Sequence, residues 1–126
     1  MSRKSIEFQM KEITKELAKK IDDAITVSMK EPPKLAKKMI MNNAPKNTGE
    51  YRSGWKIKRH RRPKSAIVYN DKAPGKAHLL EYGHVIKNQK GEYGRSPAHP
   101  HIKPAEVQSV DLFLQTLEDE LNSFTD

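Results

Sequence analysis

Histidines and one glutamate in the second half of the sequence are the side chains best suited to chemistry: His78, Glu81, His84, His99 and His101. Imidazole and carboxylate groups can hold a zinc ion when their spacing brings them together. On a continuous helix His78 and Glu81 would share a face, but His84 would point elsewhere and lies beyond Gly83. Helical zinc motifs require His-Glu-x-x-His or His-x-x-Glu-His, and Tyr82 occupies the place of the second histidine. We therefore expect no metal and no other cofactor, and a hydrogen-bonding or capping role for these residues around a short turn.

Nucleophilic and phosphate-binding chemistry finds no support in the sequence. Cysteine is absent, so neither a thiolate nucleophile nor a disulfide framework is possible. The motifs Gly-x-Ser-x-Gly and Gly-Lys-Ser/Thr, which would mark a hydrolase nucleophile or a phosphate loop, do not occur. We therefore expect a protein without enzymatic activity.

Charge is divided sharply along the chain, which has a formal net charge of +8 and a pI near 9.7. Residues 52–64 carry seven Lys or Arg and no acid, whereas residues 105–126 carry six acids and no Lys or Arg. A basic middle and an acidic tail suit binding of an anionic partner, and they suit head-to-tail self-association equally well. The candidate partner and self-assembly surface consists of Arg52, Lys56, Lys58, Arg59, Arg61, Arg62, Lys64, Glu118, Asp119 and Glu120.

Helical periodicity marks the N-terminal part of the chain. Apolar residues recur three and four positions apart through residues 5–30, which predicts a long amphipathic helix. Pro32 and Pro33 interrupt it, and Pro33 can open a second helix that ends near residues 42–43. The apolar face of this second helix consists of Leu35, Ala36, Met39 and Ile40.

Alternating patterns predict strands in the middle of the chain. Residues 55–60 alternate, and residues 65–70 are rich in β-branched and aromatic side chains, so these segments should form a hairpin. Pro63 places the turn at a very basic tip, because proline cannot sit inside a hydrogen-bonded ladder. Residues 77–82 predict one or two helical turns that end at Gly83.

The region behind Gly83 has a weaker pattern. Val85 and Ile86 predict the start of a third strand, and residues 88–95 predict a mobile loop or a long hairpin tip. Residues 96–104 contain three prolines, so they should be extended and lie along the sheet as an edge strand.

The C-terminal segment, residues 105–126, predicts a last helix that starts behind Pro104. Its apolar residues are spaced 3, 4, 3, 4 and 3 apart, as in the seam of a helix pair: Val107, Val110, Leu114, Leu117, Leu121 and Phe124. Because so lean a chain needs apolar surface for its own core, we expect this seam to pack inside the domain rather than against a neighbouring subunit.

The chain of 126 residues has the size of one domain. Its parts are a helical segment at 1–43, a sheet with a short helix and loops at 44–104, and the C-terminal helix at 105–126. The expected class is α+β: a long N-terminal helix and a C-terminal helix packed on a small antiparallel β-sheet. No apolar run is long enough to span a bilayer and the first residues are charged, so we expect a soluble protein with no membrane contact.

Three sequence blocks occur in a characteristic order. Residues 43–53 read Asn-Ala-Pro-Lys-Asn-Thr-Gly-Glu-Tyr-Arg-Ser, residues 78–84 read His-Leu-Leu-Glu-Tyr-Gly-His, and residues 97–105 read Pro-Ala-His-Pro-His-Ile-Lys-Pro-Ala. In this order the blocks resemble the tail-component family of long-tailed bacteriophages and prophages, small neck or tail-completion proteins of the head–tail junction. A departure from the family pattern is the unusually basic run at residues 59–64. The fold-defining positions of the blocks are Pro45, Thr48, Gly49, Ser53, Glu81, Gly83 and Pro104.

The blocks make physical sense as joints between elements. Pro45 stops the second helix, and residues 47–49 have the composition of a turn, so the first block should be a hinge between helices and sheet. Gly83 lets the chain reverse. Three residues of the second block are expected to pin the middle helix onto the sheet: Leu79, Leu80 and Tyr82.

The resemblance implies structural work rather than catalysis. It implies a ring of copies around the DNA channel, in contact with the head connector or head-completion protein and the tail-terminator protein. The location it implies is the virion, with assembly in the cytoplasm of the bacterial host. The basic hairpin of one subunit would then meet the acidic helix of the next.

Two other functions stay open on the residues alone. The hairpin of residues 55–69 could track a phosphate backbone, with Trp55 or Tyr69 available to stack, in a basic nucleic-acid-binding protein or a toxin-like ribonuclease. Trp55 alternates in phase with Ile57, however, which favours a core position for its ring. A metal hydrolase would instead use His78, Glu81 and His84.

Overall fold

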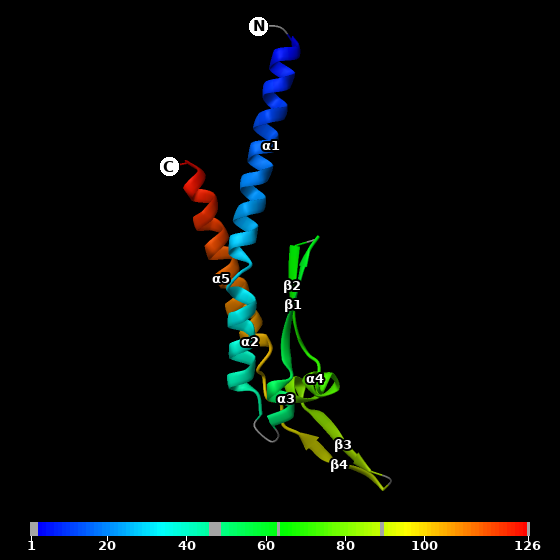
Figure 1. The fold of residues 1–126 in the computed structure, drawn as a ribbon. Helices are drawn as coiled ribbons and strands as arrows, with labels where there is room; N and C mark the ends of the chain where they lie inside the picture. Colours follow the sequence, from blue (N-terminus) through cyan, green and yellow to red (C-terminus); the bar gives the residue numbers. More distant parts are fainter. Residues whose placement is uncertain (1–2, 46–48, 63, 89, 126) are drawn as a thin grey trace.

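The computed structural model of the chain describes residues 3–45, 49–62, 64–88 and 90–125 (Figure 1). It confirms the α+β class, with a long helix near each end of the chain. A short 3₁₀ turn, Ser123–Thr125, follows the last helix. The elements in chain order are α1 (Arg3–Ser28), α2 (Pro32–Asn43), α3 (Gly49–Ser53), β1 (Trp55–Arg61), β2 (Lys64–Asn70), α4 (Pro74–Tyr82), β3 (His84–Asn88), β4 (Gly91–Ser96) and α5 (Lys103–Asn122).

Helices α1, α2 and α5 form one layer of the molecule. Helices α1 and α2 follow each other almost end to end, and α5 runs back alongside them (Figure 1). The break between α1 and α2 falls where Pro32 and Pro33 occupy the first helical positions of α2. Proline is favourable there because a first-turn residue needs no N–H for the helix. The two predicted N-terminal helices are therefore confirmed.

Small residues make the helix contacts close. Most buried positions of the three helices are small side chains: Ala24, Ser28, Ala36, Ala105 and Ser109, beside Ile40 and the two prolines that open α2. Helices approach more closely where the side chains between them are small. The contact therefore uses a different face of α5 from the expected one.

The prediction that the α5 seam packs inside the domain is wrong for most of its length. Leu117 and Phe124 are half-buried. The other four seam residues face outward and are exposed: Val107, Val110, Leu114 and Leu121. The small-residue face through Ala105 and Ser109 takes the place of the seam against α2.

The first two-thirds of α1 also differ from expectation. Residues 5–23 are exposed throughout, and the N-terminal part of α1 projects beyond the rest of the molecule as an arm (Figure 1). The amphipathic pattern predicted the helix correctly. Only its last turns, around Ala24 and Ser28, are buried.

The strands form two separate hairpins rather than one sheet. Strands β1 and β2 pair antiparallel from Trp55 opposite Asn70 to Arg61 opposite Lys64, which confirms the predicted basic hairpin. Within the described residues strands β3 and β4 pair only with each other, so the region behind Gly83 is a long hairpin. Figure 1 shows this second hairpin pointing away from the first.

The proline-rich segment is not an edge strand, contrary to the prediction. Residues 97–101 have no regular structure. They pass beside α4, where the N–H of His99 donates to the carbonyl of Leu80 at 2.7 Å. With three prolines nearby, the segment lacks the donors that a ladder requires, and the N–H groups of His99 and His101 bond to α4 instead.

The core lies where α2, α3, β1 and the start of α5 meet. Its buried members are Ala36, Ile40, Ala44, Tyr51, Trp55 and Ala105. The Trp55 ring stands edge-on to the Tyr51 ring, with centroids 5.7 Å apart, so the prediction of a core tryptophan is confirmed.

Ala44 is extended before Pro45, as expected, but Gly49 opens the short helix α3 rather than a plain turn. Thr48 lies outside the described residues.

Gly83 ends α4 as predicted, in a conformation that only glycine adopts easily. Its φ is 73°, and a Cβ atom placed there would stand 2.5 Å from the carbonyl oxygen of Ser96. Such an approach is far inside van der Waals contact. The residue therefore allows the backbones before β3 and after β4 to touch.

Substitution of Gly83 by alanine should destabilise the fold. Positive φ and the clash with Ser96 together should lower the free energy of unfolding by at least about 2 kcal/mol, measured by urea denaturation. Gly75→Ala in the first turn of α4 is the matched control, since nothing lies within 4 Å of its added Cβ. The control should be neutral or slightly stabilising, and equal effects at both positions would contradict this account.

Candidate functional site

One buried hydrogen-bonded network joins all three sequence blocks. Tyr51 comes from the first block, Glu81 from the second and His101 from the third, and their exposed fractions are 2%, 5% and 0%. The Tyr51 hydroxyl lies 2.6 Å from Nε2 of His101. Nδ1 of His101 lies 3.1 Å from Oε1 of Glu81. Residues far apart in sequence thus meet at one point between α3, α4 and α5.

Glu81 caps the N-terminus of α5 from another helix. Its Oε1 accepts hydrogen bonds from the N–H groups of His101 and Ile102, both at 2.8 Å, and Oε2 accepts from Lys103 at 2.9 Å. Ile102, the residue at the cap position of α5, has no side chain that could accept these bonds. The first N–H groups of any helix need an outside acceptor, and a carboxylate also complements the helix dipole. The predicted capping role is confirmed for Glu81, but its target is a distant helix.

The environment of Glu81 favours its charged form. Burial alone would raise the pKa of the carboxyl group, because a charge is costly away from water. The three backbone N–H groups and the nearby His101 outweigh burial, so the pKa of Glu81 lies below its ordinary value. The carboxylate is therefore ionised in the fold at neutral pH.

His101 connects Glu81 to Tyr51 through its two ring nitrogens. Nδ1 lies 2.6 Å from the carbonyl oxygen of His99, which can only accept, so Nδ1 carries a hydrogen. In the neutral ring Nε2 then accepts from the Tyr51 hydroxyl. Burial, together with the charge of Glu81, raises the pKa of Tyr51 to about 12, which keeps this hydroxyl protonated.

The network is placed to hold the fold rather than to act on a substrate. A tyrosine, a histidine and a glutamate in series resemble an activated hydroxyl, but His101 is fully buried and its ring nitrogens are both engaged. His78 lies against the Tyr82 ring, with centroids 5.1 Å apart. Across the described residues, no group of three or more His, Cys, Asp or Glu is arranged to hold a metal ion.

Two expectations about α4 are wrong. Leu79 and Tyr82 are exposed rather than pinned to the sheet, and only Leu80 of the three packs against the core. On α4, Leu80 packs against the core and Glu81 is buried beside it. The Glu81 carboxylate, together with the apolar contacts of Ala77 and Leu80, fixes α4 to the rest of the molecule.

Asn70 is a fourth polar anchor that the sequence reading missed. Its Nδ2 donates to the carbonyl of Tyr51 at 2.6 Å, and its Oδ1 accepts from the N–H groups of Lys72 and Ala73 at 3.1 and 2.8 Å. An asparagine that ends a strand just before a loop commonly bonds backbone two or three residues on. That signal was present in the sequence after residue 69.

The other motif residues lie close to this network. Ser53 ends α3, where its hydroxyl donates to the carbonyl of Glu50 at 3.2 Å and accepts from Nζ of Lys72 at 3.1 Å. Pro104 is the second residue of α5. The blocks therefore mark the joints between elements, as expected.

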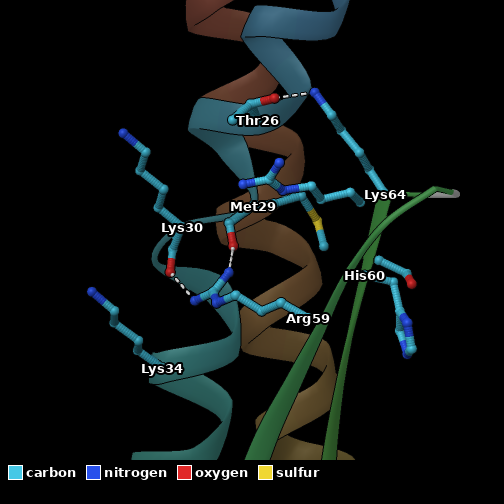
Figure 2. A pocket seen from close by; sticks show the side chains of 9 residues that line it. Thr26, Met29, Lys30, Lys34, Arg59, His60 and Lys64 are labelled. Atoms are coloured by element: carbon cyan, nitrogen blue, oxygen red, sulfur yellow. Dashed lines mark hydrogen bonds between the residues drawn. The ribbon is translucent and has the colours of Figure 1, made fainter.

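Two cations of the basic hairpin are bound to the end of α1 (Figure 2). The Arg59 guanidinium donates to the carbonyls of Met29 and Lys30 at 2.8 and 2.9 Å. Lys64 bonds the hydroxyl of Thr26 and forms an ion pair of 2.8 Å with Asp22. Cations at a helix C-terminus satisfy its free carbonyls and complement its dipole. Arg59 and Lys64 thus fasten the hairpin to the helical layer.

A basic groove lies between the hairpin and the helices (Figure 2). Its volume is about 530 Å³, and no Asp or Glu lines it among the described residues. The lining residues are Thr26, Met29, Lys30, Lys34, Arg59, His60, Arg61, Lys64 and Ser65. Such a lining favours an anionic occupant.

The remaining candidate surface residues lie on separate elements, and all are exposed except Arg52 and Glu120, which are half-buried. Lys56 and Lys58 lie on the outer face of β1, and Arg61 and Arg62 lie at the hairpin tip. Arg52 lines a second hollow of about 400 Å³ with three lysines of α2. The acidic residues occupy the last turns of α5: Glu118, Asp119 and Glu120. Within the described parts of the chain, no ion pair joins this acidic end to the hairpin.

An elongated α+β domain with its polar network buried and its apolar and charged faces exposed is typical of a structural component of a larger assembly. Residues 4–83 match the family described as "bacteriophage HK97-gp10, putative tail-component". The chain belongs to this phage tail-component family, and the match contains the first sequence block and all of the second except His84. The third block lies outside the match, and the structure joins it to the others through His101.

The other comparisons add no relative. No curated protein and no solved structure matches the chain significantly. Within the described helices, none has the length and apolar character that a membrane crossing requires.

Replacement of Glu81 by glutamine should weaken the fold most at neutral pH. Glutamine offers one acceptor oxygen and places an NH₂ group against N–H donors, so we expect a loss of about 2–4 kcal/mol in the free energy of unfolding. Because the pKa of Glu81 is lowered by folding, its contribution is complete above the unfolded value and disappears as pH falls through the folded value. Chemical denaturation from pH 7 to pH 3 should show wild type and variant converging in acid.

Glu106→Gln is the control for this measurement. Glu106 lies in the first turn of the same helix but is exposed, so its loss should cost well under 1 kcal/mol. A difference between Glu81→Gln and wild type that stays constant with pH would show that the carboxylate charge is not the stabilising element.

Proposed function

We propose that this protein joins the head and the tail of a phage particle, as a neck or tail-completion component that assembles into a ring. Membership of a tail-component family supports a structural role in the phage particle. The ring-forming role at the head–tail junction is supported by the separation of a basic surface from an acidic one. The basic hairpin and the acidic end of α5 lie on one chain, and among the described residues no ion pair joins them.

A contact between unlike surfaces of two copies can repeat around a closed ring. In the proposed ring the hairpin tip of one subunit, Arg61 and Arg62, faces the acidic end of α5 in the next. Arg59 and Lys64 stay with α1 and hold the hairpin at a fixed angle. The remaining faces are left for the head-completion and tail-terminator proteins, and assembly takes place in the bacterial cytoplasm.

Deletion of the gene from its phage or prophage should yield filled heads and free tails that do not join. Negative-stain electron microscopy of lysates would count joined and separate particles, and a plasmid copy of the wild-type gene should restore joining. The variant Arg61→Glu/Arg62→Glu should restore it poorly, because it reverses the charge of the proposed contact.

Lys38→Glu/Lys76→Glu is the matched control, since it makes the same change in net charge at exposed positions outside the hairpin. It should restore joining as well as wild type does. Normal particles without the gene would overturn the head–tail role, whereas equal rescue by both double variants would overturn only the hairpin contact.

The basic groove favours a second candidate function, contact with the DNA that passes through the channel. Six of its nine lining residues are Lys, Arg or His, and they come from the hairpin, from the link between α1 and α2, and from α2. The phosphate backbone of DNA is a suitable occupant because its charge is repeated and sequence-independent.

Binding to double-stranded DNA should then weaken steeply as salt rises. Fluorescence anisotropy over a salt series gives the slope of log K against log salt, to which each phosphate contact contributes about −0.9. Arg61→Glu/Arg62→Glu should reduce the steepness by at least about 1, because Arg61 lines the groove, and Lys38→Glu/Lys76→Glu should leave it unchanged. Binding too weak to measure at low salt would rule out this second function.

A further inference from the structure

The arm of α1 carries an apolar stripe that its own chain leaves uncovered. The stripe consists of Ile6, Met10, Ile13, Leu17 and Ile21, whose exposed fractions range from 40% to 63%. Their spacings of three and four put them on the helix face that Ala24 and Ser28 bury further along. A helix of this length without packing is only marginally stable in water. The stripe therefore requires an apolar partner.

Helix α5 cannot provide that partner within the same chain. Its end reaches only the level of Lys20, whose Nζ lies 5.8 Å from the centroid of the Phe124 ring. Figure 1 shows the arm continuing beyond this point while α5 diverges from it. The side chains from Ser5 to Lys20 are accordingly all exposed.

A second uncovered strip runs along the outside of α5. Val107, Val110, Leu114 and Leu121 are 37–55% exposed, and they lie beside the face that packs on α2. Large exposed apolar patches on a folded domain commonly mark interaction sites. The molecule thus presents two unpartnered apolar surfaces, one on each long helix.

The two surfaces match in length and are complementary in charge. At 1.5 Å per residue, the arm stripe spans about 22 Å and the α5 strip about 21 Å. In the sequence, residues 3–20 carry six Lys or Arg and three Glu, whereas residues 105–126 carry six acids and no Lys or Arg. An arm that faced another arm would bring two positive segments together, whereas an arm on α5 brings opposite charges together.

We propose that the arm of one copy packs its apolar stripe on the outer strip of α5 in a second copy. The inference rests on the proposed function, because an arm-to-α5 contact leaves a free arm at one end and a free strip at the other. Copies therefore add until a ring closes. The covered stripe gives the arm the tertiary packing that it lacks in the single chain.

Cross-linking between single introduced cysteines tests this contact. The chain has no cysteine of its own, so only the introduced thiols can react. Ile13 and Leu114 lie near the midpoints of the two surfaces, so Ile13→Cys and Leu114→Cys should meet whether the helices run parallel or antiparallel. Mixtures of the two purified full-length variants, treated with a short bis-maleimide over a dilution series, should give the mixed dimer on a denaturing gel. Lys15→Cys, on the opposite face of the arm, should give at least about tenfold less product with Leu114→Cys.

Two results would overturn the contact. One is absence of the Ile13–Leu114 product at every concentration, and the other is efficient linkage of Ile13→Cys only to itself, which would indicate paired arms. The head–tail role is read independently from rescue by Ile13→Glu/Leu17→Glu in the deletion strain. Full joining by this variant would reject the arm contact and leave the role intact, whereas joined particles in the unrescued strain would reject the role.

Discussion

The carboxylate of Glu81 on the N-terminus of α5 is the interaction on which the rest of the structure depends. Three N–H groups that start α5 have no local acceptor, and Glu81 satisfies all of them from α4. Because a buried charge is tolerated only when it is fully hydrogen-bonded, neither helix can shift without a large cost. His101 extends the constraint to Tyr51 and so to α3 and the aromatic core.

The constraint explains why a thin, elongated domain can hold a defined shape. The buried core is small, with six residues in its main cluster, so burial of apolar area alone gives little orientation. Directional bonds supply that orientation at three joints. Glu81 joins α4 to α5, Asn70 joins β2 to α3, and Arg59 joins β1 to the end of α1.

Because the buried core is small, much apolar side-chain surface stays exposed. Close contact between helices through small residues uses one narrow face of each, so larger side chains on the neighbouring faces stay exposed. In a protein that acts alone this would be a hazard, since exposed apolar patches associate. In a component of the phage tail it is consistent with stability that is completed by assembly.

The sequence by itself determined all helices except α3, the basic hairpin, the breaks at Pro32, Pro45 and Gly83, the division of charge and the family. These features depend on local periodicity and on the backbone limits of proline and glycine, which a linear pattern records. Only the tertiary structure decided which face of α5 is buried, that Glu81 caps α5 and that Arg59 and Lys64 bind α1. Such contacts depend on how closely elements far apart in sequence approach. In this protein the helices pack through their small side chains, and the apolar seam predicted for α5 stays mostly exposed.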